Sequence, residues 1–115
     1  MKRVVIESPY AGDVERNRRY LAAAMLDSLQ RGEAPFASHA LYPMVLDDSI
    51  PRDRDLGIRA GLTWAAYGDL TAIYCDLGIS EGMIAGIAQA RALGRIVEYR
   101  NLRGEWTPPN IEGGT

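Results

Sequence analysis

The sequence holds few of the residues that build disulfides, metal sites and membrane spans. Its 115 residues include one cysteine, Cys75, and one histidine, His39. A single cysteine excludes an internal disulfide, and so few metal-binding side chains argue against a structural zinc site. No apolar run reaches the roughly 18 residues of a membrane span, and Glu7 and Pro9 interrupt the opening apolar run too early for a signal peptide. We therefore expect a cytoplasmic protein with no metal, no cofactor and no membrane association.

An excess of charge of one sign is also missing. Thirteen Lys and Arg residues stand against fifteen Asp and Glu residues, which gives a net charge of −2. This balance argues against a nucleic-acid binder that relies on bulk positive charge. The length corresponds to one domain. We expect that domain at residues 1–100, followed at residues 101–115 by a tail or oligomerisation arm that carries Trp106.

Short β-branched runs alternate with helical patterns along the chain. Strands are predicted at residues 3–7, 35–38, 70–75 and 95–99. Capping residues and glycines predict helices from Asp13 to Gly32, from Pro51 to Gly68 and from Glu81 to Gly94. Residues 39–50 are predicted to form a long loop.

This order of elements predicts an α/β fold, a small flavodoxin-like or Rossmann-like parallel sheet with helices on both faces. Right-handed crossovers favour the strand order 2-1-3-4. In that order the direction of strand addition changes between the first and third strands. Open α/β sheets bind ligands beyond the carboxyl ends of the strands at such a switch point. Residues 8–13 and 76–82 follow these two strands and are therefore the candidate ligand loops.

The first loop offers backbone amides and one aromatic ring to a ligand. Pro9 keeps Ser8 extended, and Gly12 allows the positive φ that turns amides toward a helix start. Tyr10 is placed to stack on a base. A plain strand-to-helix turn capped by Asp13, with solvated arginines, also explains the pattern. The candidate ligand-binding residues here are Ser8, Pro9, Tyr10, Gly12, Asp13 and Arg16.

The second loop is rich in glycine and opens a helix. Ser80 can cap that helix, and Gly78 and Gly82 let free amides approach an anion or a sugar closely. Asp76 ends a strand, where a carboxylate can accept hydrogen bonds from ribose hydroxyls. His39 follows the second strand at the same end of the sheet. The candidate ligand-binding residues here are His39, Asp76, Gly78, Ser80, Glu81, Gly82 and Met83.

Glycine spacing has a second explanation. Gly57 and Gly61 lie one helical turn apart, as do Gly82 and Gly86. In soluble proteins such spacing more often serves close packing of helices than contact with a ligand. We expect packing roles for Gly57, Gly61 and Gly86, and a ligand role for Gly82.

The chain resembles the nucleoside 2-deoxyribosyltransferase-like superfamily of small flavodoxin-like domains. Within it the chain is most similar to an uncharacterised branch that is frequent in phages and actinobacteria. The resemblance covers roughly residues 3–99, and Ser8-Pro9-Tyr10 is similar to the first substrate loop of the superfamily. Its most specific part is the strand-turn-helix segment that contains Asp69, Cys75, Asp76, Gly78, Ser80, Gly82, Ala90 and residues 94–97.

The resemblance implies a nucleoside pocket and chemistry at the N-glycosidic bond. In the superfamily a glutamate on the third helix attacks the anomeric carbon, and an upstream aspartate orients the base. The corresponding position in this chain is Gly86, which has no side chain. Glu81 is the nearest carboxylate, about one and a half helical turns away, and Asp76 is the other catalytic alternative. The resemblance thus implies the pocket without its nucleophile.

Three functions fit these observations. The missing nucleophile favours binding of a nucleotide-like ligand, an ADP-ribose derivative or a cyclic nucleotide, and in a phage such a domain would be an anti-defence sponge that sequesters a signalling nucleotide. The alternative is an N-glycosidase or (deoxy)ribosyltransferase that acts on nucleosides or nucleotides. The third is an interaction domain without a ligand, since fold alone does not specify function. The small core and the Trp106 arm predict a homo-oligomer, a dimer or higher.

Overall fold

The four strands form one parallel sheet in the order β2-β1-β3-β4 in the computed structural model, which describes residues 1–102. The strands are β1 (Arg3–Glu7), β2 (Ala34–Phe36), β3 (Leu70–Tyr74) and β4 (Ile96–Arg100). In the central pairing, Val4 lies opposite Leu70 and Glu7 opposite Ile73. The α/β class and the strand order predicted from the sequence are confirmed. Trp106 lies outside the described residues.

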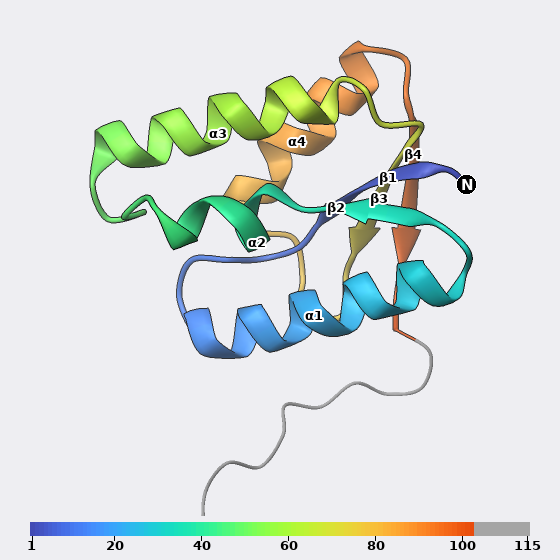
Figure 1. Ribbon diagram of the computed structural model, residues 1–115, viewed down its shortest axis with the longest axis horizontal. Coiled ribbons are helices and arrows are strands. Elements are labelled where there is room, and N and C mark those ends of the chain that lie inside the picture. Colours follow the sequence, from blue (N-terminus) through green and yellow to red (C-terminus); the bar gives the residue numbers. More distant parts are fainter. Residues whose placement is uncertain (103–115) are drawn as a thin grey trace, which may run out of the picture.

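Three long helices cover the sheet, α1 (Val14–Gln30), α3 (Pro51–Ala65) and α4 (Glu81–Ala92). Figure 1 shows α1 on one face, and α3 and α4 on the other. Asp13 caps α1 by accepting a hydrogen bond from the Arg16 amide at 3.1 Å, and Ser80 caps α4 through the Met83 amide. Within residues 1–102, no helix is both long and apolar enough to cross a membrane.

The alternation of side chains along β1 assigns each residue to one face of the sheet. Val4 and Ile6 are buried in a core that includes Tyr20 and Leu21 of α1. Successive strand residues point to opposite faces, so Val5 and Glu7 lie on the face covered by α3 and α4. All five residues of β3 are buried, which agrees with its central position.

The prediction of a loop at residues 39–50 is wrong for its first part, which is helical. The structure has the short helix α2 (Ser38–Leu41) followed by the 3₁₀ helix η1 (Tyr42–Met44). A methyl group at Gly61 would lie 2.7 Å from the Ser38 Cβ atom, so glycine lets α3 approach α2. A methyl group at Gly57 would lie 3.3 Å from the Leu46 Cδ1 atom, the end of a flexible side chain. The packing role expected for Gly61 is confirmed, and its contact joins α3 to a helix that the local sequence does not signal.

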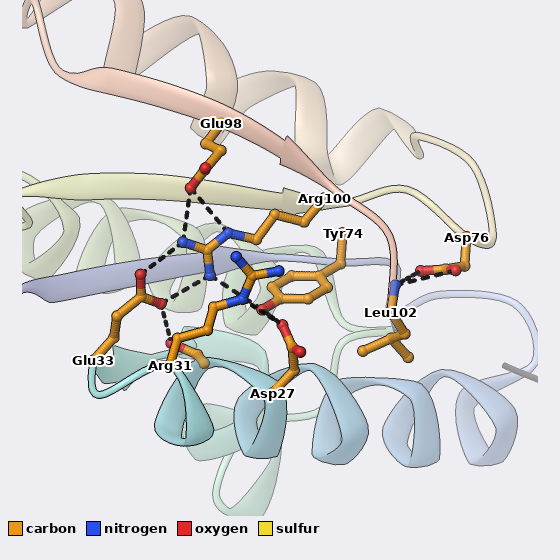
Figure 2. Close-up of polar contacts among 9 residues, drawn as sticks. Asp27, Arg31, Glu33, Tyr74, Asp76, Glu98, Arg100 and Leu102 are labelled. Carbon is orange, nitrogen blue, oxygen red and sulfur yellow. Dashed lines mark hydrogen bonds and ion pairs between the residues drawn. The ribbon is translucent and has the colours of Figure 1, made fainter. Parts of the chain in front are cut away.

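A network of paired charges lies on the α1 face of the sheet (Figure 2). The Arg100 side chain is only 3% exposed and donates hydrogen bonds to both carboxylate oxygens of Glu33, at 2.7 and 2.8 Å. It also bonds Glu98 and the Tyr74 hydroxyl, and Tyr74 donates to Asp27. The Arg100 guanidinium holds the pKa of Glu33 below its usual range. Each buried charge of this network therefore has a partner, and the network links β4 to β3, to α1 and to Glu33 in front of β2.

Candidate functional site

A pocket of about 430 Å³ opens at the carboxyl end of β1. Its walls come from the β1–α1 loop, from α2 and η1, and from the N-terminal parts of α3 and α4. The volume is within the range of about 300–1,000 Å³ that small-molecule sites occupy. It also lies where the sheet order places the switch point, between β1 and β3.

The pocket brings together about half of the residues that the sequence singled out. Those that line it are Ser8, Tyr10, His39, Ser80, Glu81 and Gly82. The others do not line it: they are Pro9, Gly12, Asp13, Arg16, Asp76, Gly78 and Met83. Asp13 is bound to the α1 amide, and Met83 is buried beneath the start of α4. Ligand contacts by this second group stay predictions.

Asp76 is committed to contacts within the fold. Its carboxylate accepts a hydrogen bond from the Tyr20 hydroxyl at 2.6 Å and another from the Leu102 amide at 3.0 Å. The Tyr20 hydroxyl in turn accepts from the Asp76 amide. Figure 2 shows the bond to Leu102. These contacts tie the end of β3 to α1 and to the chain that follows β4.

Ser8 and His39 form a hydrogen-bonded pair inside the pocket. The Ser8 Oγ and His39 Nε2 atoms are 2.6 Å apart, and Ser8 is buried. Burial lowers the pKa of His39 to about 4, so the imidazole is neutral at physiological pH. In residues 1–102 no carboxylate is seen to bond the second ring nitrogen, so the pair lacks the orienting acid of a catalytic triad.

Glu7 is the site residue that the sequence reasoning missed. It ends β1 and lines the pocket, and its side chain has no hydrogen bond or ion pair with any residue that the structure describes. Burial alone raises the pKa of its carboxyl to about 8. Two signals in the sequence could have found it: an acidic residue at the carboxyl end of a central strand, and an alternation that turns it away from Val4 and Ile6.

Gly86 provides the space that the Glu7 carboxyl occupies. A methyl group built at Gly86 would overlap the Glu7 carboxylate, with the carboxyl carbon 2.5 Å away. Gly86 therefore serves close packing, as expected, and its partner is an acidic side chain. The position that the superfamily resemblance left without a carboxylate faces a carboxyl group from another element.

The remaining walls combine acidic and apolar side chains. The charged groups are Asp48, Asp53, Glu81 and a single cation, Arg54. The apolar wall consists of Tyr10, Tyr42, Pro43, Leu46 and Ile58. In the part of the chain that is described, no three His, Cys, Asp or Glu side chains gather as metal ligands would. The site can thus hold an aromatic ring against its apolar wall and offer it a proton.

Comparisons with known proteins agree with this fold. Residues 2–100 match the family model described as "Domain of unknown function (DUF7768)". Among solved structures, the chain is similar to the CMP N-glycosidase BcmB of Clostridium botulinum, with a TM-score of 0.50 and 17% sequence identity over 87% of this chain and 69% of that chain. No curated protein matches the chain by sequence. At this identity the likeness to the glycosidase shows a shared fold.

Proposed function

Because the chain belongs to the family described as a domain of unknown function (DUF7768), we propose its function from the site: the pocket binds a nucleoside or nucleotide, with the N-glycosidic bond beside Glu7. One observation carries this proposal, an acidic side chain that lines a pocket at the switch point and is bonded to none of residues 1–102. An acid without a partner lowers stability, and such groups concentrate at functional sites. The apolar wall gives the base a surface on which to pack.

The charges of the pocket narrow the ligand class. Asp48, Asp53 and Glu81 are the acidic side chains of the wall besides Glu7, and Arg54 is the cation that lines it. Acidic side chains on the wall of a pocket repel negatively charged ligands. We therefore place uncharged nucleosides ahead of the ADP-ribose derivatives and cyclic nucleotides expected from the sequence. CMP, which the name of the structural neighbour gives as its substrate, is among the first ligands to test.

Binding has two possible consequences for the ligand. A domain that retains it intact would act by sequestration, the role of an anti-defence sponge. A domain that cleaves it would be an N-glycosidase. Sequestration and the homo-oligomer both stay predictions. The carboxyl group of Glu7 favours cleavage.

A ligand screen with a matched pair of variants tests the proposal. We expect a nucleoside or monophosphate to raise the melting temperature of the full chain, since a ligand at 100 times its Kd adds about 2.7 kcal/mol of stability. Gly82→Val is expected to abolish this shift and the heat of binding in calorimetry. A Cβ atom at Gly82 would meet only the Ser80 Oγ atom, at 3.9 Å, so the fold accommodates valine while the pocket loses volume.

Ala88→Val is the control, because Ala88 lies on α4, is exposed, and does not line the pocket. It places the same β-branched residue in the same helix and should leave binding intact. The proposal fails if no compound of the class shifts the melting temperature, or if Gly82→Val binds as tightly as the wild-type chain.

A further inference from the structure

Glu7 is placed to act on a bound ligand. It lies at the carboxyl end of β1, on the sheet face covered by α4, it lines the pocket, and its carboxyl group lies against Gly86 of α4. No described residue binds this carboxyl group. A half-buried acid whose hydrogen-bonding capacity is unused by the described residues can give its proton to a ligand.

The other acidic groups near the pocket are less suited to that task. Glu81 and Asp48 are exposed, so water competes for their hydrogen bonds. Asp53 accepts a hydrogen bond from the Asp47 amide at 2.9 Å, and Asp76 is held by Tyr20. Among the described acidic residues of the wall, Glu7 is the one with a desolvated carboxyl group that no described residue binds.

Glu7 carries a proton at neutral pH, as a general acid must. Burial raises its pKa to about 8, so the group is mostly the neutral carboxylic acid at pH 7. General acids work best when their pKa lies near the working pH. His39 is neutral there, because burial lowers its pKa to about 4. The other titratable or charged groups that line the pocket are Tyr10, Tyr42, Asp48, Asp53, Arg54 and Glu81.

We propose that Glu7 is the catalytic acid of an N-glycosidase that hydrolyses nucleosides or nucleoside monophosphates. This inference rests on the proposed function, because it requires a nucleoside in the pocket. It assigns the reaction to a residue on β1, in place of the helix position occupied by Gly86 and of the alternatives Glu81 and Asp76.

The reaction balances with water as the co-reactant. The bond between the anomeric carbon and the base nitrogen breaks, and its electron pair stays on the nitrogen, which takes the proton of Glu7. The carboxylate that remains stabilises the positive charge on the sugar. A water oxygen then bonds to the anomeric carbon, and the proton that the water loses returns to Glu7. The products are the free base and the free sugar or sugar phosphate, and Glu7 is again protonated.

The test combines base release with binding in the full chain. Nucleosides and CMP are incubated with the protein, and chromatography measures the free base. We expect Glu7→Gln to slow base release by about 100-fold or more, the usual contribution of a general acid, while Kd stays within a few-fold. Glu15→Gln is the control, since it removes an exposed carboxylate of α1 that pairs only with Arg19 among the described contacts. It should leave base release unchanged.

A second variant and a pH profile keep the inference testable if Glu7→Gln folds poorly. Gly86→Ala leaves Glu7 in the chain but displaces its carboxyl group, and should also slow base release. In the wild-type chain the rate should fall tenfold per pH unit above about pH 8, as Glu7 loses its proton.

The outcomes separate the two proposals. Base release by the wild-type chain that is lost in Glu7→Gln, with binding retained, supports both. Binding without base release, base release at the wild-type rate in Glu7→Gln, or a rate that rises with pH through 8 overturns the role of Glu7 and leaves the proposed pocket standing. If the chain shows no binding and no base release, the proposed function is overturned, and this inference fails with it.

Discussion

The two faces of the sheet differ in whether a desolvated ionisable group has hydrogen-bond partners. On the α1 face, Arg100 is 3% exposed and is bonded to Glu33, Glu98 and Tyr74 (Figure 2). On the other face, Glu7 lies against Gly86 and is bonded to none of the described residues. Both groups lose water on folding, but only Arg100 gains partners in return.

This difference separates a structural role from a functional one. A buried charge with complete hydrogen bonding fixes how elements pack, and removing one partner leaves the other uncompensated. A desolvated acid without a hydrogen-bond partner links no elements through hydrogen bonds and becomes neutral instead, at the expense of stability. The Arg100 network therefore belongs to the fold, whereas Glu7 has the properties of a group kept for a ligand.

Removing Arg100 from its network should have the largest effect on the free energy of unfolding. We expect Arg100→Met to destabilise the chain by about 3–5 kcal/mol, because it leaves the Glu33 carboxylate half-buried without its main partner. Urea denaturation measures the change. The control is Arg59→Met, which breaks an exposed pair with Asp55 on α3 and should change stability by less than about 1 kcal/mol. Equal effects of the two variants would show that the network contributes no more than a surface pair.

Replacing Glu7 should change the free energy of unfolding in the opposite direction. We expect Glu7→Gln to raise the free energy of unfolding by up to about 4 kcal/mol at pH 8, because the unfolded wild-type chain ionises Glu7 and the folded chain resists it. The gain should vanish at pH 4, where both states hold the proton. Denaturation at the two pH values measures it, and a loss of stability at pH 8 would mean that Glu7 has a structural partner.

The pH dependence of wild-type stability gives the smallest and most specific signal. Glu7 has a folded pKa of about 8 against an ordinary value of 4.5, so its contribution is present at low pH and is lost as the pH rises through that window. His39 has a folded pKa of about 4 against 6.5, so its contribution is lost as the pH falls from 6.5 to 4. The two trends oppose each other below pH 6.5, and only that of Glu7 acts from 6.5 to 8.

Stability of the wild-type chain should therefore fall by up to about 2 kcal/mol between pH 6.5 and 8, at no more than about 1.4 kcal/mol per pH unit. In Glu7→Gln the curve should be flat over the same interval. A wild-type curve that is flat as well would show that Glu7 titrates near its ordinary pKa. Such a result would remove the distinction between the two faces.

The candidate site was only partly accessible to sequence reasoning. The switch point follows from the order of strands and helices, and it directed attention to Ser8, Tyr10, Glu81 and Gly82, which line the pocket. The wall formed by α2, η1 and α3 was not anticipated, because residues 39–50 carry no helical periodicity. The close approach of Ser38 to Gly61 joins α2 to α3, two segments that are distant in the sequence.

The sequence by itself determined the sheet. Alternation of β-branched strands with capped helices, and the handedness of crossovers, leave few arrangements of these elements, and the observed order is the predicted one. Only the tertiary structure decided which ionisable groups are paired. Arg100 meets Glu33 across 67 residues, and Glu7 meets Gly86 across most of the chain. Periodicity reports which face a side chain takes, but the pKa and the partner of a charge depend on what the fold brings against that face.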